Sequence, residues 1–225
     1  MSTETAAPAK PAEGLFSKKN RKLITDPLND NNPITVQVLG ICSALAITVK
    51  LENALVMSIS VMAVLIAGNM SISALRNLIP GRIRIIAQLV IAAGLVTLVD
   101  IILKAYVYDV SKQVGVYVGL IITNCIIMGR FEAFAMGNKP LPSAMDAIGN
   151  SFGYAWILIV VAFFRELFGN GTLMGMRIMQ EDWYAVNGGG YFNNNMMILP
   201  PMALVIVGVI IWIQRARNTK LIEQA

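Results

Sequence analysis

The stretch LIITNCIIMGR, residues 120–130, places a polar Thr-Asn pair directly before Cys125 inside an otherwise apolar run. The only other cysteine, Cys42, lies in a similar run, VLGICSALAITVK, at residues 38–50. Both cysteines therefore occur in apolar segments that small or polar residues interrupt. This shared setting indicates that the two segments have a common role.

The composition is typical of a membrane protein. Of the 225 residues, 56% are hydrophobic and 14% are charged, whereas about 25% of residues are charged in a soluble domain. The chain has no histidine, so the commonest general base and the commonest metal ligand are both missing. Any transition-metal site must therefore depend on Cys42 and Cys125 or on carboxylates.

Six apolar runs predict six membrane-spanning segments, at 34–49, 53–75, 83–106, 114–129, 151–168 and 197–214. Four of them are long enough to cross a hydrocarbon core of about 30 Å as helices. The first and the fourth have only 16 residues each, which is roughly 24 Å of helix at about 1.5 Å per residue. These two segments carry the cysteines, and we expect them to be short or broken helices.

The distribution of lysine and arginine predicts the orientation. With a cytoplasmic N-terminus, 13 of the 18 basic residues fall on the cytoplasmic side, so the positive-inside rule places both termini in the cytoplasm. Residues 1–33 contain no apolar core of signal-peptide length, and we expect a flexible basic extension there. The membrane domain then covers 34–214, and a cytoplasmic tail covers 215–225.

The six segments divide into two sets of three with opposite insertion, because the first segment runs outward and the fourth runs inward. VQVLGIC at 36–42 and VGLIITNC at 118–125 give weak sequence support for a repeat. Short or broken helices at matching positions of inverted halves indicate a site inside the membrane. The predicted fold is an all-α integral membrane protein of two inverted three-helix repeats.

Several interpretations of the cysteines are open from the residues alone. A free cysteine often packs as a small hydrophobic side chain, and two cysteines can form a disulfide bond. As ligands without histidine, thiolates favour zinc, copper(I) or an iron–sulfur cluster. A [2Fe–2S] cluster held by thiolates needs four cysteines. Two cysteines in one chain would supply half of that set, so a second chain would supply the rest.

Four motifs carry a resemblance to a known family: NNPITVQVLGICSALAITVKLENA (31–54), LKAYVYDVSKQVGVYVGLIITNCIIMGRFEAFAM (103–136), PSAMDAIGNSFGY (142–154) and FFRELFGNGTL (163–173). They resemble the family formed by the D-type subunits of the sodium-translocating NADH:quinone oxidoreductases and the related E-type subunits of Rnf complexes. The resemblance runs from about residue 30 to the C-terminus. LKAYVYDVSKQ is more similar to the quinone-reductase subunit.

The resemblance implies membership of a respiratory enzyme complex of the bacterial inner membrane, which passes electrons from NADH to ubiquinone and exports sodium. In this family the homologous D-type and E-type subunits each give two cysteines to a shared intramembrane [2Fe–2S] cluster that relays electrons. Cys42 and Cys125 stand at the matching positions. The implied partners are subunits A, B, C, E and F, some of which carry FAD, FMN and riboflavin. The chain is not expected to be catalytic alone or to bind nucleic acid.

Two carboxylates, Asp100 and Asp146, are candidates for a sodium pathway on the strength of this resemblance. The alternative for Asp100 is an interfacial ion pair with Lys104, four residues later, and the helical spacing favours that alternative. The alternative for Asp146 is a cap on the helix that follows it, because an acidic group suits the positive end of a helix dipole.

Three rival functions remain. An Rnf-type subunit would exchange electrons between ferredoxin and NAD in a different complex. A secondary transporter built from inverted repeats would bind no iron. A structural membrane scaffold would keep electron flow intact when Cys42 or Cys125 is replaced.

Overall fold

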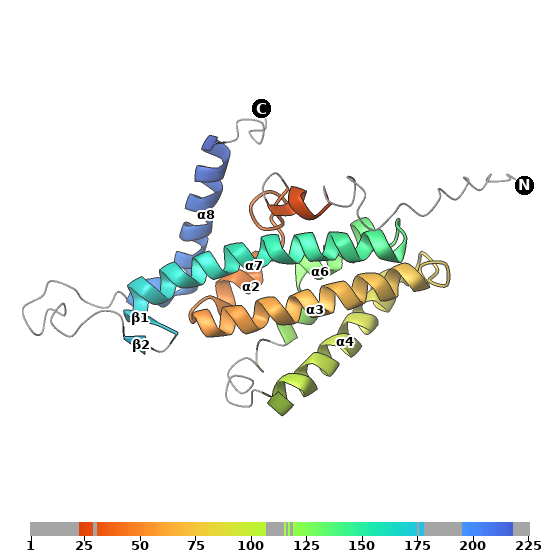
Figure 1. The fold of residues 1–225 in the computed structure, drawn as a ribbon, viewed down its shortest axis with the longest axis horizontal. Coiled ribbons are helices and arrows are strands. Elements are labelled where there is room, and N and C mark those ends of the chain that lie inside the picture. The colour runs from red at the N-terminus through yellow and green to blue at the C-terminus, as the bar shows by residue number, and fades with distance from the viewer. Residues whose placement is uncertain are drawn as a thin grey trace, which may run out of the picture.

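The computed structural model describes residues 23–28, 31–106, 115, 117, 119–174, 176–177 and 195–217, and this part of the chain is mostly helical (Figure 1). Its helices are η1 (Asp26–Leu28), α2 (Ile41–Ile47), α3 (Leu51–Leu75), α4 (Arg84–Tyr106), α6 (Cys125–Arg130), η2 (Phe131–Ala135), α7 (Pro140–Asn170), η5 (Asn195–Ile198) and α8 (Pro200–Arg217). The strands β1 (Thr172–Leu173) and β2 (Met176–Arg177) pair antiparallel after α7. The all-α prediction is therefore right for the long helices and misses this short hairpin.

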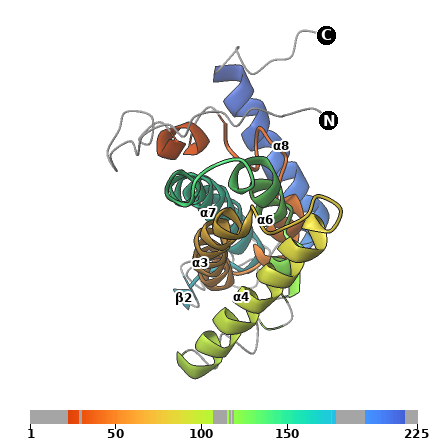
Figure 2. The same cartoon turned by 90° about the vertical axis from the view of Figure 1, so that its right-hand side faces the viewer.

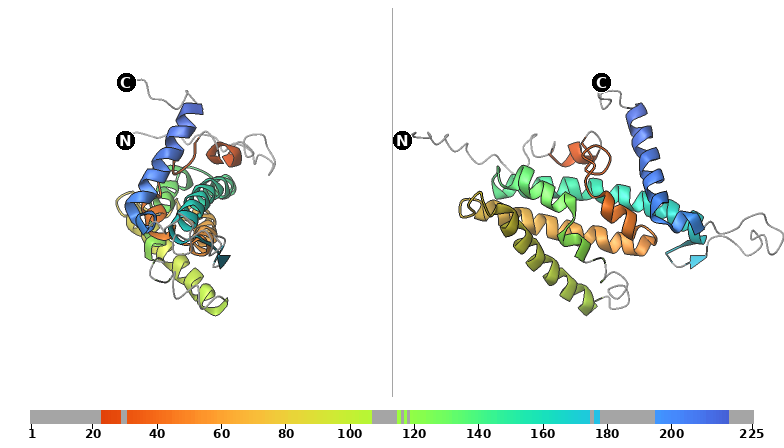
Figure 3. Two further views of the ribbon diagram at one scale, coloured as in Figure 1. Left: turned by 90° about the vertical axis from the view of Figure 1, so that its left-hand side faces the viewer. Right: turned by 180° about the vertical axis from the view of Figure 1, so that it is seen from behind.

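The centre of the fold is the antiparallel pair of α3 and α7, which lie side by side (Figures 1 and 3). Leu51 N, at the start of α3, donates to Glu166 Oε2 near the end of α7 at 2.6 Å. Asn69 Nδ2, near the end of α3, donates to the Ser143 carbonyl near the start of α7 at 3.1 Å. These hydrogen bonds join the pair at both ends. Gly68 of α3 lets the ring of Phe131 pack where any Cβ would overlap it.

α4 and α8 extend away from this central pair in opposite directions (Figure 2). Of the most apolar 18-residue stretch of each helix, only 17% is buried in α4 and 11% in α8, against 50% in α3 and 61% in α7. Large apolar side chains are exposed along both outer helices: Ile86, Val90 and Ile101 on α4, and Val205, Val209 and Trp212 on α8. Such extensive apolar surface is expected where a helix faces lipid or another protein chain.

The described residues contain four helices that are long and apolar enough to cross a membrane, α3, α4, α7 and α8. They correspond to the four predicted long spans. α7 begins earlier than predicted, at Pro140 rather than 151. Pro140 can start the helix because a proline at the first helical position loses no intrahelical hydrogen bond. α8 continues to Arg217, two residues beyond the start of the predicted tail of 215–225, and residues 218–225 lie outside the described part.

The two short predicted spans are interrupted beside their cysteines. In the first, helix α2 occupies only Ile41–Ile47. In the fourth, the backbone leaves the helix at Thr123 and Asn124, and α6 begins at Cys125. Among the α-helices, one short helix and two long ones follow each other in α2–α3–α4 and again in α6–α7–α8, with η2, the β1–β2 hairpin and η5 between the members of the second set. The division into six spans and the inverted insertion of two repeats stay predictions.

The predicted flexible extension, residues 1–33, is packed against α7 in its described portion. Asn32 is 2% exposed and donates to the Gly153 carbonyl at 3.1 Å. A Cβ at Gly153 would lie 2.5 Å from the carbonyl oxygen of Pro27. Glycines of α7 allow the described residues between 23 and 33 to pack closely there, and the flexibility of the extension stays a prediction. Residues 1–22 lie outside the described part.

Candidate metal centre

Each cysteine lies in the first turn of a short helix, directly after a break in the backbone. α2 follows Gly40, whose φ of 82° lies in the left-handed region that favours glycine. α6 follows Asn124, whose backbone is extended and whose Oδ1 accepts a hydrogen bond from Ile126 N at 3.3 Å. Asparagine is among the residues most favoured at this capping position. These local signals explain why a short helix begins beside the cysteine in each apolar run; these two helices, α2 and α6, are called the half-helices below.

The two half-helices bring the thiols together. Cys42 Sγ lies 3.9 Å from Cys125 Sγ, and both cysteines are free and exposed. A disulfide bond would need about 2.05 Å between the sulfurs, so the structure does not support that interpretation. Exposure likewise argues against a role in core packing. Two thiolates on one tetrahedral metal ion, with metal–sulfur bonds of about 2.3 Å, lie about 3.8 Å apart. The observed spacing suits a pair of ligands to one metal ion.

The described residues supply no larger ligand set than these two thiols. They contain no group of three or more His, Cys, Asp or Glu side chains that could hold a metal ion. Because the thiols are exposed, groups from another chain can approach the remaining coordination positions of an ion that they bind. The donor set fits half of a four-thiolate cluster, as the count of cysteines in the sequence predicts.

A buried polar network lies directly behind the cysteines. Ser43 Oγ lies 2.7 Å from the Tyr154 hydroxyl and 3.5 Å from Asn124 Nδ2, and it donates to the Gly40 carbonyl at 2.7 Å. Ser43, Asn124 and Tyr154 are each 0% exposed. The aromatic ring packs against Gly40, where a Cβ would come within 3.0 Å of it. The network therefore joins α2, α7 and the start of α6.

α7 also holds the far end of α2. Arg165, which is 1% exposed, donates to the Leu45 carbonyl at 3.2 Å and to Thr48 Oγ1 at 2.5 Å. It also donates to the carbonyls of Met197 and Ile198, at 3.1 and 2.6 Å, in η5 ahead of α8. A cation near the last carbonyls of a helix also suits the helix dipole. Arg165 thus ties α2, α7 and the segment before α8 together.

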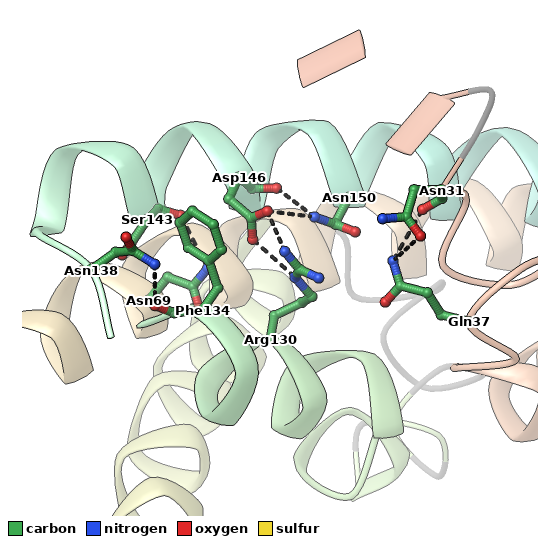
Figure 4. A network of polar contacts seen from close by, with 9 residues as sticks. All are labelled: Asn31, Gln37, Asn69, Arg130, Phe134, Asn138, Ser143, Asp146 and Asn150. Carbon is green, nitrogen blue, oxygen red and sulfur yellow. Dashed lines mark hydrogen bonds and ion pairs between the residues drawn. The ribbon is translucent and has the colours of Figure 1, made fainter. Parts of the chain in front are cut away.

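Asp146 lies in the second turn of α7 and forms a buried ion pair with Arg130, the last residue of α6 (Figure 4). Arg130 Nε donates to Asp146 Oδ2 at 2.9 Å, and its Nη2 bonds the other carboxylate oxygen. Asn150 Nδ2 donates to Asp146 Oδ1 at 3.1 Å. The interpretation of Asp146 as a helix cap is therefore wrong, because α7 begins before it. The pair anchors the end of the second cysteine half-helix to α7.

The other candidate, Asp100, forms an ion pair with Lys104 at 2.6 Å, with the lysine side chain 59% exposed. The structure confirms the pair that the helical spacing favoured. The structure does not bring Asp100 into contact with either cysteine in any hydrogen bond or ion pair found among the described residues. The two sodium candidates therefore differ in setting, since the Asp146 side chain is 3% exposed and the Asp100 side chain is 19% exposed.

The sequence alone did not reveal the roles of Tyr154 and Arg165. Both fall in motifs that carry the family resemblance, PSAMDAIGNSFGY and FFRELFGNGTL, and Arg165 is also a charged residue inside the predicted span 151–168. Tyr154 bonds Ser43 across 111 positions of the chain, and Arg165 bonds Thr48 across 117. The periodicity of the sequence places Tyr154 and Arg165 in a helix but does not identify their partners.

Four long apolar helices and a thiol pair presented by two interrupted helices define a multi-pass membrane protein with a candidate metal centre. Residues 20–211 match the family described as "Rnf-Nqr subunit, membrane protein". The chain belongs to this family.

Relatives of the chain include proteins named as the D subunit of the Na(+)-translocating NADH-quinone reductase. One from Shewanella sp. (strain ANA-3) is 50% identical over 211 residues, which cover 92% of this chain and 97% of the relative. One from Shewanella baltica (strain OS155 / ATCC BAA-1091) is 51% identical with the same coverage. One from Proteus mirabilis (strain HI4320) is 51% identical over 208 residues, which cover 92% of this chain and 98% of the relative.

Proposed function

We propose that this chain is the D-type membrane subunit of a sodium-translocating NADH–quinone reductase in a bacterial inner membrane. The high identity to proteins of that name, over nearly the whole of both chains, supports this assignment. Its partners are subunits A, B, C, E and F, with the homologous E-type subunit as its direct counterpart. Catalysis belongs to the assembled complex, in which other subunits carry FAD, FMN and riboflavin and handle NADH and ubiquinone.

Within that complex, Cys42 and Cys125 supply half of the ligands of a [2Fe–2S] cluster shared with the homologous subunit. The observation that carries this proposal is the 3.9 Å separation of two exposed thiols at the starts of two half-helices. When bound, such a cluster supplies a one-electron carrier within the membrane. This chain holds the two thiolates at a fixed spacing and keeps their partner-facing side open.

The deciding experiment is iron analysis and EPR spectroscopy of the isolated complex, with wild type beside Cys42→Ala and Cys125→Ala. Each variant should lose one iron–sulfur signal and the corresponding iron. Thr97→Ala is the matched control, because its hydroxyl bonds only the Ala93 carbonyl of its own helix, at 2.8 Å. Retention of every iron–sulfur signal in both cysteine variants would refute the site. Zinc or copper in place of iron would refute the cluster but keep the thiol pair as a metal centre.

Measurements on the same complex distinguish the proposed function from its rivals. An Rnf-type enzyme would reduce NAD with ferredoxin and would be encoded beside Rnf partner genes, whereas a quinone reductase oxidises NADH with ubiquinone. A secondary transporter would contain no iron. A scaffold would keep full electron flow in Cys42→Ala and Cys125→Ala.

We propose further that Asp146, as well as Asp100, contributes to the sodium pathway. Asp146 is the buried carboxylate of the two, and its Arg130 partner must release it before it can bind a cation. Asp146→Asn should weaken the sodium dependence of quinone reduction, measured as initial rate against sodium concentration. An unchanged sodium dependence would eliminate Asp146 from the pathway, and Asp100→Asn tests the other residue in the same way.

A further inference from the structure

Tyr154 is the largest side chain in the buried network behind the cysteine pair. It projects from α7, its ring contacts Gly40, and its hydroxyl lies 2.7 Å from Ser43 Oγ. At 0% exposure it has no access to solvent. The phenol hydroxyl therefore relies on Ser43, at 2.7 Å, and on the neighbouring Asn124 side chain for its hydrogen bonds, because a buried polar group without a partner is costly.

Counting donors and acceptors gives the direction of each hydrogen bond around Ser43. A serine hydroxyl has one proton and two lone pairs. The proton goes to the Gly40 carbonyl at 2.7 Å, so Tyr154 must donate to Ser43 Oγ, and Asn124 Nδ2 donates to the second lone pair at 3.5 Å. Ser43 thus uses its full hydrogen-bonding capacity, and it is the point at which Tyr154 and Asn124 meet.

The network is one residue away from each thiol. Ser43 follows Cys42 in the chain, and Asn124 precedes Cys125. Asn124 also caps α6 through Ile126 N, so a shift of its side chain would move the first turn that carries Cys125. Ser43 bonds Gly40 at the break that begins α2, so a shift of Ser43 would move the turn that carries Cys42.

We propose that Tyr154 is a positioning residue for the thiol pair. Its hydroxyl holds Ser43, and through Ser43 it holds the capping residue Asn124, so that Cys42 Sγ and Cys125 Sγ keep the spacing that one metal ion requires. The spacing of the two thiols is a property of this chain alone. Its consequence for bound iron rests on the function proposed above.

The spacing can be measured without iron. In the complex stripped of iron with a chelator, the oxidant diamide should join Cys42 to Cys125, and mass spectrometry of peptides from this chain counts the linked product. Tyr154→Phe keeps the ring and removes the hydroxyl. We expect it to slow formation of this disulfide by roughly threefold to tenfold, because reaction rates fall steeply when the reacting atoms are misplaced. Ser43→Ala should slow it at least as much.

The double variant tests whether Tyr154 acts through Ser43. Tyr154→Phe combined with Ser43→Ala should behave as Ser43→Ala does alone, because Ser43 is the link between Tyr154 and the thiols. Ser151→Ala is the matched control, since it removes another fully buried hydroxyl of α7 that has no hydrogen-bond partner among the described residues. Wild-type disulfide rates in Tyr154→Phe, or additive effects in the double variant, would overturn the proposal. If Tyr154→Phe does not assemble, Ser43→Ala beside Ser151→Ala tests the link through which Tyr154 must act, and a wild-type disulfide rate in Ser43→Ala would overturn the proposal.

A second measurement uses the complex with its iron. Tyr154→Phe should keep wild-type iron content while the EPR line shape and the midpoint potential of the iron–sulfur signal change. Unchanged spectra together with unchanged disulfide rates would contradict a positioning role. If instead both cysteine variants keep all iron signals, the cluster assignment fails, and the disulfide rates still decide the role of Tyr154.

Discussion

Arg165 Nη1 donates to Thr48 Oγ1 at 2.5 Å, across 117 positions of the chain, and so fixes the end of α2 to α7. The same guanidinium reaches three main-chain carbonyls on two segments. Both half-helices are therefore held by α7: α2 through Arg165 and Tyr154, and α6 through Asp146. A single long helix thus sets the position of both cysteines.

Replacing Arg165 should destabilise the fold more than replacing any exposed arginine. Arg165→Gln leaves several buried carbonyls without donors, and each hydrogen bond to a charged group contributes about 1.5–3 kcal/mol. We expect the free energy of unfolding to fall by about 3 kcal/mol or more, seen as a lower melting temperature of the complex in detergent. Arg217→Gln, at the exposed end of α8, is the control and should change it little. Equal melting temperatures of the two variants would show that Arg165 is not an anchor.

Gly68→Ala should disturb the contact between α3 and η2. A Cβ at this position overlaps the ring of Phe131, which is 0% exposed. Overpacking of this kind costs about 1–3 kcal/mol. In the double variant Gly68→Ala with Phe131→Leu, leucine replaces the ring with a smaller side chain, which should restore part of the stability that Gly68→Ala loses. A double variant that is less stable than the sum of the two single changes would argue against direct overlap.

The ion pair between Arg130 and Asp146 gives a test by double-mutant cycle. Removing only one partner leaves a buried charge without its counter-ion, which costs about 3–5 kcal/mol. Asp146→Asn and Arg130→Gln should each lower the melting temperature strongly, and the double variant should be less unstable than the sum. Simple addition of the two effects would mean that the pair is not coupled. This measurement also separates a stability defect of Asp146→Asn from an effect on sodium.

The ion pair between Asp100 and Lys104 should contribute little. The lysine side chain is largely exposed, and pairs of this kind at helical spacing contribute about 0.3–0.5 kcal/mol. Asp100→Asn is expected to leave the melting temperature of the complex within error of wild type, at low salt and at high salt. A loss as large as that of Asp146→Asn would indicate that a partner covers this part of α4.

The sequence allowed the membrane class, the four long spans and the breaks beside both cysteines to be predicted. These are local properties: apolar length fixes a span, while Gly40 and the Thr-Asn pair before Cys125 end or start a helix within a few residues. The contact between the N-terminal segment and α7 was not predicted. This contact depends on Gly153 and Asn32, which are 121 positions apart and form no local pattern.

The sequence by itself determined that this chain can supply two thiolates and no more, because it contains only two cysteines. Only the tertiary structure decided that the two thiols lie 3.9 Å apart, with Tyr154 and Ser43 behind them and α7 as the common support. The physical reason is distance along the chain. Cys42 and Cys125 are separated by 83 positions, and they meet because α3 and α7 pack against each other and buried hydrogen bonds tie each half-helix to α7. Periodicity and helix propensity act over one or two turns, so they cannot specify a contact between two cysteines so far apart in the chain.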